Sequence, residues 1–430
     1  MSETRFNHLM LALLSVIAVF IPFRELISLY TFSFVKVIPD LCVLIALIAF
    51  LIYKKFWFKF DKVDIAFLAF LAFGFVTTVL FNHLEISRYI LECRSIALYY
   101  ILYFILKNIR ISDEISQKVG RVLQYVVLII VIFAIIEKVT YKELLFPEVW
   151  KNDIIYMNNY IRAYSFFNNP NSFAAFLIFA FIYIYQIFGN PWDKRNAPFT
   201  LLTFVGILIS VSRSTIILLG VFLIGVAILK KYYMLKKQKK GLFTKNTLII
   251  ILLSFVCWGC IEGASKLYME HISTNTYEGD ITSIDRFNEL VSNEIVENSS
   301  SDGRIYSIKT GLEVFDDHKI VGTGFGTYGS SASLMRGSPI YEEYDIREGF
   351  YSDNEYIVIL VETGVIGSLI AIAFIGTIIY DNKYDLFKIL ACVVFGGLGM
   401  FYNVLETQGL AFLFWMTLAM PNYVERKYWS

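Results

Sequence analysis

The chain has 430 residues, of which 57% are apolar and only 17% are charged. A soluble domain of this size would expose too much apolar surface to stay dispersed, so the composition excludes an ordinary soluble enzyme and indicates an integral membrane protein. The formal net charge of +1 gives no reason to expect a nucleic-acid partner.

Apolar runs follow one another along the whole chain. A bilayer core about 30 Å thick needs roughly 20 apolar residues per helix, and fewer where flanking side chains snorkel. We therefore predict an all-α integral membrane protein with about 12 transmembrane helices. The first run lacks a small-residue cleavage site, so we expect a helix rather than a signal peptide. The runs lie near residues 8–22, 36–53, 63–81, 95–107, 122–137, 172–188, 198–212, 214–229, 246–262, 355–380, 387–402 and 409–421.

Lysine and arginine gather in every second loop between these runs, which is typical of cytoplasmic loops. Both chain ends are then expected in the cytoplasm. The stretch 198–229 fits this alternation only as a tight hairpin of two helices, broken at Ser212, Arg213 and Ser214, with Arg213 at the outer surface. The basic segment 230–245 is best explained as a topology signal with some attraction to anionic lipid.

The same alternation places the polar segments on the outer face of the membrane. We expect transmembrane helices 1–9 within residues 1–262 and a large extracytoplasmic loop with short helices at residues 263–353. Helices 10–12 then lie within residues 354–430, and a shorter external loop covers residues 138–171.

Two cysteines, Cys257 and Cys260, form a C-x-x-C inside one predicted helix. Because no second pair and no histidine lies nearby in the sequence, thiols that pack as small hydrophobes explain them better than zinc or redox chemistry. We expect neither a metal nor a cofactor.

The first constellation of polar residues is Arg162 followed by an Asn-Pro-Asn turn, with Asn171 or Ser172 as the expected N-cap of the sixth helix. Ordinary helix initiation explains the asparagines but not Arg162. Its guanidinium beside an outward-facing helix N-terminus would suit a diphosphate, because both favour oxyanions.

The second constellation is Ser210-Val-Ser-Arg213-Ser at the mouth of the hairpin. An arginine with apolar neighbours is costly to bury unless an anion meets it or its side chain snorkels outward. The surrounding serines favour a binding site over a snorkelling arginine.

The third constellation lies in the large loop. Asp302-Gly-Arg304 precedes a helical stretch that ends near His318, and Gly322, Gly324 and Gly326 follow. No strand and no acidic ribose partner frame these glycines, so they do not form a nucleotide fingerprint. We interpret them as a turn that packs closely on the membrane domain, and His318 as structural.

The fourth constellation opens the tenth helix, where Asp353 and Asn354 are expected to cap the helix. Glu362 follows about 12 Å along the helix axis. An ionisable group at that depth normally faces the bundle and pairs with a cation, for which the external arginines are the nearest candidates.

In this order on one external face, the four constellations resemble the O-antigen ligase and Wzy polymerase superfamily of bacterial membrane glycosyltransferases. The resemblance covers about half of the chain, and only the ordered set of motifs is specific. The residues that carry it are Arg162 with the Asn-Pro-Asn turn, Ser212-Arg213, Arg304 with Asp316 and Gly322-Thr-Gly324, and Asp353-Asn354 with Glu362 and Gly364-Val-Ile-Gly367.

The resemblance implies a substrate, a location and a mechanism. Members act on undecaprenyl-diphosphate-linked glycans at the outer face of the bacterial inner membrane, without nucleotide sugar or metal. Arg162, Arg213 and Arg304 would bind the diphosphate, while a polar residue deprotonates the acceptor hydroxyl. This division is physically sound, because a diphosphate leaves readily once its charge is compensated.

The sequence departs from the ligase pattern at one position. Ligases place a histidine before the asparagine of the tenth helix, whereas this chain has Asp353. The difference favours a repeat-unit polymerase and makes Asp353, with Asn354, the candidate catalytic pair. Asp353 would act as the base only if burial raises its pKa above the usual value of about 4. Asn171, Glu362 and Asp40 are expected in supporting roles.

The leading hypothesis is therefore a polymerase that builds O-antigen, capsule or a related surface polysaccharide. Its expected partners are the undecaprenyl-diphosphate-linked oligosaccharide and the bilayer, and a chain-length-regulating co-polymerase is a further partner to test for. One alternative is a ligase that transfers finished glycan to a lipid or protein. Another is a flippase or secondary transporter, although transporters place polar groups near the bilayer midplane.

Overall fold

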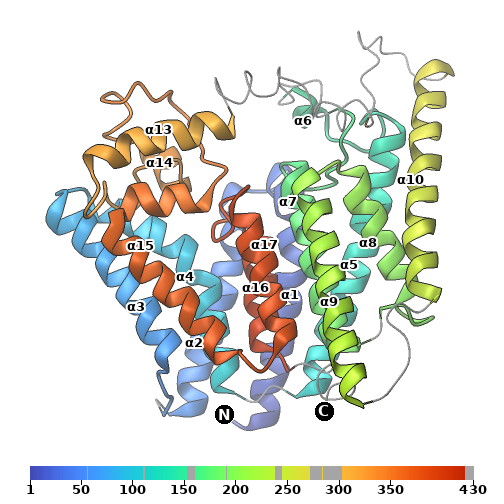
Figure 1. The fold of residues 1–430 in the computed structure, drawn as a ribbon, viewed down its shortest axis with the longest axis horizontal. Helices are drawn as coiled ribbons and strands as arrows, with labels where there is room; N and C mark the ends of the chain where they lie inside the picture. Colours follow the sequence, from blue (N-terminus) through green and yellow to red (C-terminus); the bar gives the residue numbers. More distant parts are fainter. Residues whose placement is uncertain are drawn as a thin grey trace. The chain divides into compact units, whose positions relative to one another are not determined.

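A computed structural model describes residues 1–55, 57–109, 112–152, 160–189, 191–237, 245–271, 283 and 303–421. Every regular element in these residues is helical, as the sequence predicts (Figure 1). The chain forms two compact units, and we describe each by itself. The first contains Met1–Tyr53, Arg110–Val291 and Met416–Ser430, and the second contains Lys54–Ile109 and Ser292–Trp415.

Each of the predicted apolar runs forms an apolar helix. Among the residues that the structure describes, eight helices are long and apolar enough to cross a membrane, which confirms the membrane class. The remaining runs form the shorter apolar helices Ala197–Ile209, Arg213–Leu229, Leu386–Gly399 and Gln408–Ala419. The number of helices that actually span the bilayer stays a prediction.

In the first unit, α5 packs against α1, α7, α8 and α10. Helix α7 is apolar on all sides and its side chains from Phe173 to Ile187 are buried, as expected for a helix surrounded by others. The helices of this unit are α1 (Glu3–Tyr30), α2 (Ile38–Lys54), α5 (Asp113–Val139), α6 (Glu148–Asn152), α7 (Pro170–Phe188), α8 (Ala197–Ile209), α9 (Arg213–Lys237) and α10 (Lys245–His271), with a short 3-10 helix at Ser33–Val37 before α2.

Helix α10 runs past residue 262, where the sequence places its end. Its added turns are tied to the α5 side of the unit. The Ser265 hydroxyl donates to the Lys138 carbonyl oxygen at 2.9 Å, and the Tyr268 hydroxyl donates to Glu143 at 2.8 Å. Most of the predicted large loop up to residue 302, including Asp302, lies outside the described residues.

In the second unit, α3 packs against α15, and α13 lies on the first half of α15. Val314 of α13 and Val361 of α15 are fully buried in an apolar cluster with Tyr328. The helices of this unit are α3 (Lys62–Phe75) with a π-helical turn at Val76–Phe81, α4 (Ile86–Asn108), α13 (Arg304–Asp317), α14 (Ser331–Arg336), α15 (Glu355–Asp381), α16 (Leu386–Gly399) and α17 (Gln408–Ala419).

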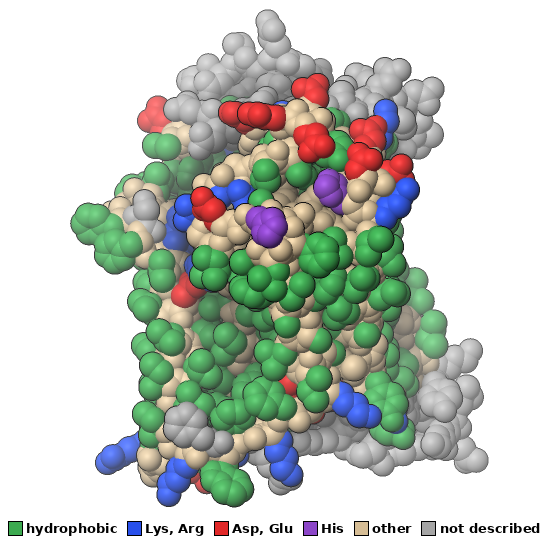
Figure 2. Space-filling model, turned by 90° about the vertical axis from the view of Figure 1, so that its left-hand side faces the viewer, with side chains coloured by type: hydrophobic (Ala, Val, Ile, Leu, Met, Phe, Trp, Pro, Cys, Tyr) green, Lys and Arg blue, Asp and Glu red, His purple; other side chains and the backbone are tan. Residues whose placement is uncertain are grey.

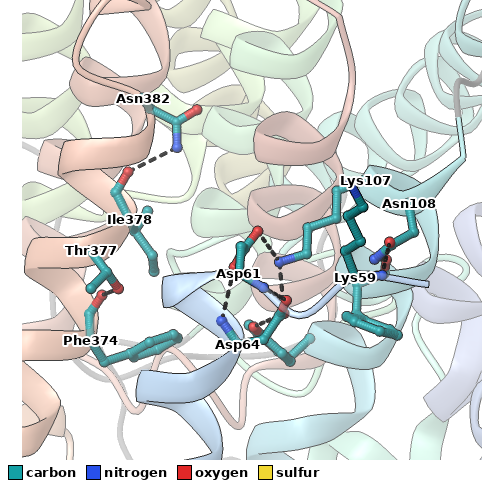
Figure 3. A network of polar contacts seen from close by, with 11 residues as sticks. Lys59, Asp61, Asp64, Lys107, Asn108, Phe374, Thr377, Ile378 and Asn382 are labelled. Atoms are coloured by element: carbon teal, nitrogen blue, oxygen red, sulfur yellow. Dashed lines mark hydrogen bonds and ion pairs between the residues drawn. The ribbon is translucent and has the colours of Figure 1, made fainter.

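A partly buried ion cluster joins the start of α3 to the end of α4 (Figure 3). The Lys107 ammonium lies 2.7 Å from Asp61 Oδ2 and 2.6 Å from Asp64 Oδ1. The Tyr100 hydroxyl donates to Asp64 at 2.6 Å. Asp61 and Asp64 also form a capping box at the start of α3, so the cluster fixes both helix ends. We call Asp61, Asp64, Tyr100 and Lys107 the Lys107 cluster.

The side chains on one face of the molecule are arranged as a bilayer requires. Figure 2 shows hydrophobic side chains across the middle of that face, with lysine and arginine below and most of the acidic side chains above. Such a band between charged ends is typical of a membrane-spanning protein.

Candidate functional site

The first and second constellations meet in the first unit. The Arg162 Nε donates to the Ser210 carbonyl oxygen at 2.9 Å, and an Arg162 Nη donates to Asn171 Oδ1 at 2.6 Å. Arg162 is only 5% exposed. Its guanidinium therefore links the start of α7 to the end of α8 in this structure.

The N-cap of α7 differs from the prediction. Asn169, rather than Asn171 or Ser172, is the cap, and its side chain accepts from the Ser172 amide at 2.7 Å. The predicted cap is wrong because Pro170 occupies the first helical position, where its missing N–H is harmless. Asn171 is thus available to bond Arg162.

The α8–α9 turn is the predicted hairpin. Helix α8 ends at Ile209 and α9 begins at Arg213, so the predicted break is present but lies at residues 210–212, and Arg213 and Ser214 are already helical. Val211 in the turn has a positive φ of 51°, unfavourable for a β-branched residue. Arg213 is half-buried at the first position of α9.

A buried ion pair that sequence reasoning missed holds the loop around Arg162. The Glu137 carboxylate pairs with the Lys142 ammonium and accepts a hydrogen bond from the Ser165 amide at 2.6 Å. Lys142 also donates to the Arg162 carbonyl oxygen at 2.8 Å. In the sequence, this pair is visible only as an acidic and a basic residue near the end of an apolar run. The same pattern is typical of an exposed helix end.

In the second unit, Asn354 is the N-cap of α15, as predicted. Its side-chain oxygen accepts from the Ile357 amide at 3.1 Å, and its side-chain nitrogen donates to the Met400 carbonyl oxygen at 3.3 Å. Asp353 precedes it and is half-buried. Burial raises the pKa of Asp353, while the positive charge of Arg304 acts in the opposite direction.

Arg304 is the first residue of α13. Its guanidinium lies over the Phe401 ring at 5.2 Å. An Arg304 Nη also lies 3.5 Å from the Phe401 carbonyl oxygen, while the neighbouring Met400 carbonyl accepts from Asn354. Arg304 of the third constellation and Asn354 of the fourth therefore contact adjacent residues of one loop.

Glu362 has different partners from those predicted. Its Oε1 accepts hydrogen bonds from the backbone amides of Thr327 at 2.9 Å and Tyr328 at 3.0 Å. We expected the Glu362 carboxylate to pair with an arginine. Among the described residues, it instead bonds to backbone amides. Such donors compensate a buried carboxylate without a second buried charge.

The glycine-rich turn packs closely on α15, as the sequence indicates. Gly322 has a φ of +75°, and a Cβ atom there would lie 2.4 Å from the carbonyl carbon of Glu362. Only glycine tolerates both conditions without strain. Gly364, which breaks the regular geometry of α15 at a φ of +61°, meets the same turn at the Ile320 carbonyl. The His318 carbonyl accepts from the Gly322 amide at 3.0 Å, which fits a structural role.

The predicted site residues fall in both compact units. Arg162, Asn171, Arg213 and Asp40 belong to the first, with Asp40 half-buried in the first turn of α2. Arg304, Asp353, Asn354 and Glu362 belong to the second. Convergence of the three arginines on one pocket stays a prediction. In the part of the chain that the structure describes, no group of His, Cys, Asp or Glu side chains could hold a metal ion.

These features define a polytopic helical membrane protein with arginines and a carboxyl group at the ends of its helices. Residues 198–372 match the family model described as O-antigen ligase. This match supports the predicted resemblance to the O-antigen ligase and Wzy polymerase superfamily. This family indicates a ligase-type or polymerase-type function on lipid-linked oligosaccharide at a membrane. No curated protein is similar enough to the chain to count as a match.

Proposed function

We propose that this protein is a Wzy-type polymerase that joins undecaprenyl-diphosphate-linked repeat units into O-antigen, capsular or related surface polysaccharide. The observation that carries the proposal is the half-buried Asp353 just before α15, within the matched family region, with its neighbour Asn354 and Arg304 in contact with adjacent residues of one loop. In the superfamily that this chain resembles, ligases have a histidine at this position, so the aspartate favours repeat-unit polymerisation. The reaction takes place on the outer face of the bacterial inner membrane.

In the proposed reaction, Arg304 binds the diphosphate of the donor together with Arg213 and Arg162. Asp353 removes the proton from an acceptor hydroxyl, whose oxygen then bonds to the anomeric carbon of the donor. The bond between that carbon and the diphosphate oxygen breaks, and the lipid diphosphate leaves with the electron pair. Compensation of the diphosphate charge by arginine makes it a good leaving group.

The surroundings of Asp353 suit a general base better than those of an exposed aspartate. Burial raises the pKa of Asp353, and a base with a raised pKa holds the transferred proton more firmly. Asn354 fixes the position of Asp353, because it caps α15 and also bonds to Met400.

The second candidate is an O-antigen ligase, which the description of the matched family favours. A ligase would need a separate lipid or protein acceptor, whereas a polymerase extends lipid-linked repeat units alone. Incubating the detergent-solubilised protein with purified lipid-linked repeat unit, and resolving the products by size, distinguishes the two. A ladder of products supports the polymerase, and an unchanged substrate contradicts it.

Cells provide a second test. A strain that lacks the protein is expected to display single repeat units or none, and normal long chains would contradict the proposal. Arg213→Ala, Arg162→Ala and Arg304→Ala are each expected to abolish chain extension while leaving a folded protein. Full activity in all three variants would mean that the diphosphate binds elsewhere.

A further inference from the structure

The loop between α16 and α17, residues 400–407, lies against the start of α15 in the second unit. The Asn354 side chain donates to the Met400 carbonyl oxygen at 3.3 Å. The Leu405 backbone amide donates to the Glu355 carboxylate at 3.2 Å. The loop thus forms a wall beside the proposed catalytic pair, although it lies beyond the matched family region.

Glu406 is the charged residue of this wall. Its carboxylate accepts hydrogen bonds from the Tyr351 hydroxyl at 3.1 Å and from the amide and hydroxyl of Ser331, both at 2.9 Å. The Asn403 side-chain nitrogen lies 3.5 Å away. All of these donors are neutral, and burial raises the pKa of Glu406. A carboxyl group held only by neutral donors can accept further hydrogen bonds from the hydroxyl groups of a ligand.

Asn403 supplies a second and independent observation. It is only 2% exposed, and its side-chain nitrogen donates to the Gly329 carbonyl oxygen at 3.3 Å as well as to Glu406. Its Oδ1 atom is buried and has no hydrogen-bond partner among the described residues. An unsatisfied buried acceptor is costly, and a hydroxyl donor from a ligand would remove that cost.

An aromatic ring completes the wall. Phe401 is half-buried and lies under the Arg304 guanidinium, with 5.2 Å to its ring centroid. Glu406 and Tyr351 are also half-buried, so a ligand at the surface can reach them. An aromatic ring beside a few fixed polar acceptors is the composition of a small-molecule binding site, and it matches a sugar, which has apolar C–H faces and hydroxyl edges.

We propose that the α16–α17 loop forms the subsite for the acceptor glycan, in which Glu406 and Asn403 accept hydrogen bonds from sugar hydroxyl groups and Phe401 contacts a sugar face. The proposal rests on the proposed function, because it assumes that a glycan approaches Asp353. Arg304 then serves the diphosphate of the donor, and Glu406 serves the hydroxyl groups of the acceptor glycan.

The test measures glycan binding to the full-length protein in detergent by saturation-transfer NMR. The probe is the glycan released by mild acid from the lipid-linked oligosaccharide that accumulates in cells lacking the protein. Glu406→Gln and Asn403→Ala are each expected to weaken binding about tenfold, as the loss of a charge-assisted or buried hydrogen bond predicts. Glu343→Gln is the matched control, because Glu343 is exposed in the same unit, and it should bind as the wild type does.

Equal affinity of the wild type and both variants would overturn the subsite. Should either variant fail to purify as a monodisperse protein, Phe401→Ala decides in its place, with the same expected loss. Steady-state assays with donor and acceptor varied separately should show a raised KM for the acceptor and an unchanged KM for the donor.

The failure of the subsite and the failure of the proposed function are distinguishable. A wild-type protein that binds the glycan, loses it on Glu406→Gln and makes no polymer would overturn the polymerase and leave the subsite standing. A wild-type protein that polymerises, while Glu406→Gln and Phe401→Ala bind and react unchanged, would overturn the subsite alone.

Discussion

Two groups of buried or half-buried carboxyl side chains in the second unit are stabilised in different ways. In the Lys107 cluster, one ammonium group lies within ion-pair distance of both Asp61 and Asp64. Glu355, Glu362 and Glu406, which we call the acidic group, instead accept hydrogen bonds from backbone amides.

The difference in bonding partners indicates what each group does for the fold. The Lys107 cluster joins two helix ends, where the charges of side chains can meet each other. The acidic group fixes irregular backbone, because an amide in a loop has no helical partner and needs an acceptor. Glu355 bonds to Leu405 and Glu406 bonds to Tyr351, both near the start of α15, so these contacts shape the proposed site, whereas the Lys107 cluster stabilises its scaffold.

The largest expected effect is on the rate of chain extension, and it distinguishes the proposed site from the Lys107 cluster. Asp353→Asn should lower the initial rate of chain extension by about 10²–10⁴-fold, because the amide cannot accept the proton. Lys107→Arg, which keeps a cation near both aspartates, should leave the rate unchanged. A rate for Asp353→Asn close to that of the wild type would exclude Asp353 as the base.

The next effect concerns the Lys107 cluster. Lys107→Met leaves Asp64, which is 1% exposed, without its cation. The free energy of unfolding should fall by about 3–5 kcal/mol, as for other buried pairs that lose one partner. Equilibrium unfolding in mixed micelles measures it, with Lys383→Met as the control because Lys383 is exposed. Equal losses in both variants would mean that the cluster is not stabilising.

A smaller effect is expected in the acidic group. Glu362→Ala removes the acceptor of the Thr327 and Tyr328 amides, which should cost about 1–3 kcal/mol of stability. Glu362→Gln keeps one acceptor oxygen and should cost less. The same unfolding assay compares the two, and an equal loss in both would show that the charge of Glu362, rather than its hydrogen bonds, holds the loop.

The smallest effect is a shift along the pH axis. Asp353 must be deprotonated to act, so the rate should fall as the pH drops through its pKa. Because burial raises that pKa, the acid limb of the rate profile should lie above pH of about 4, the usual value for aspartate. Lys107→Arg should leave the limb in place. A rate that stays constant down to that pH would contradict the raised pKa.

Several features of the site could be predicted from the sequence. The hairpin break at Arg213, the cap at Asn354 and the close packing of Gly322 follow from local rules about hydropathy, capping and glycine. Other features could not be predicted, because their partners are far apart in the chain. Glu362 bonds to amides about 35 residues away, and no charge pattern marks a backbone donor.

The α16–α17 loop shows the same limit. Asn403 and Glu406 are ordinary loop residues in the sequence, and only the contacts with Tyr351, Ser331 and Gly329 distinguish them. The ion pair of Glu137 with Lys142 was missed for a related reason, since charged residues near the end of an apolar run are as typical of an exposed helix end.

By itself, the sequence determined that this is a helical membrane protein and approximately where its apolar helices lie, because burial in lipid depends on local composition and each helix satisfies its own backbone. It also pointed to the family through the order of its motifs. Only the tertiary structure decided the partners of the buried charges, the Arg162 link between α7 and α8, and the wall beside Asp353. Those contacts join segments that are distant in sequence, and their energies depend on geometry that composition does not encode.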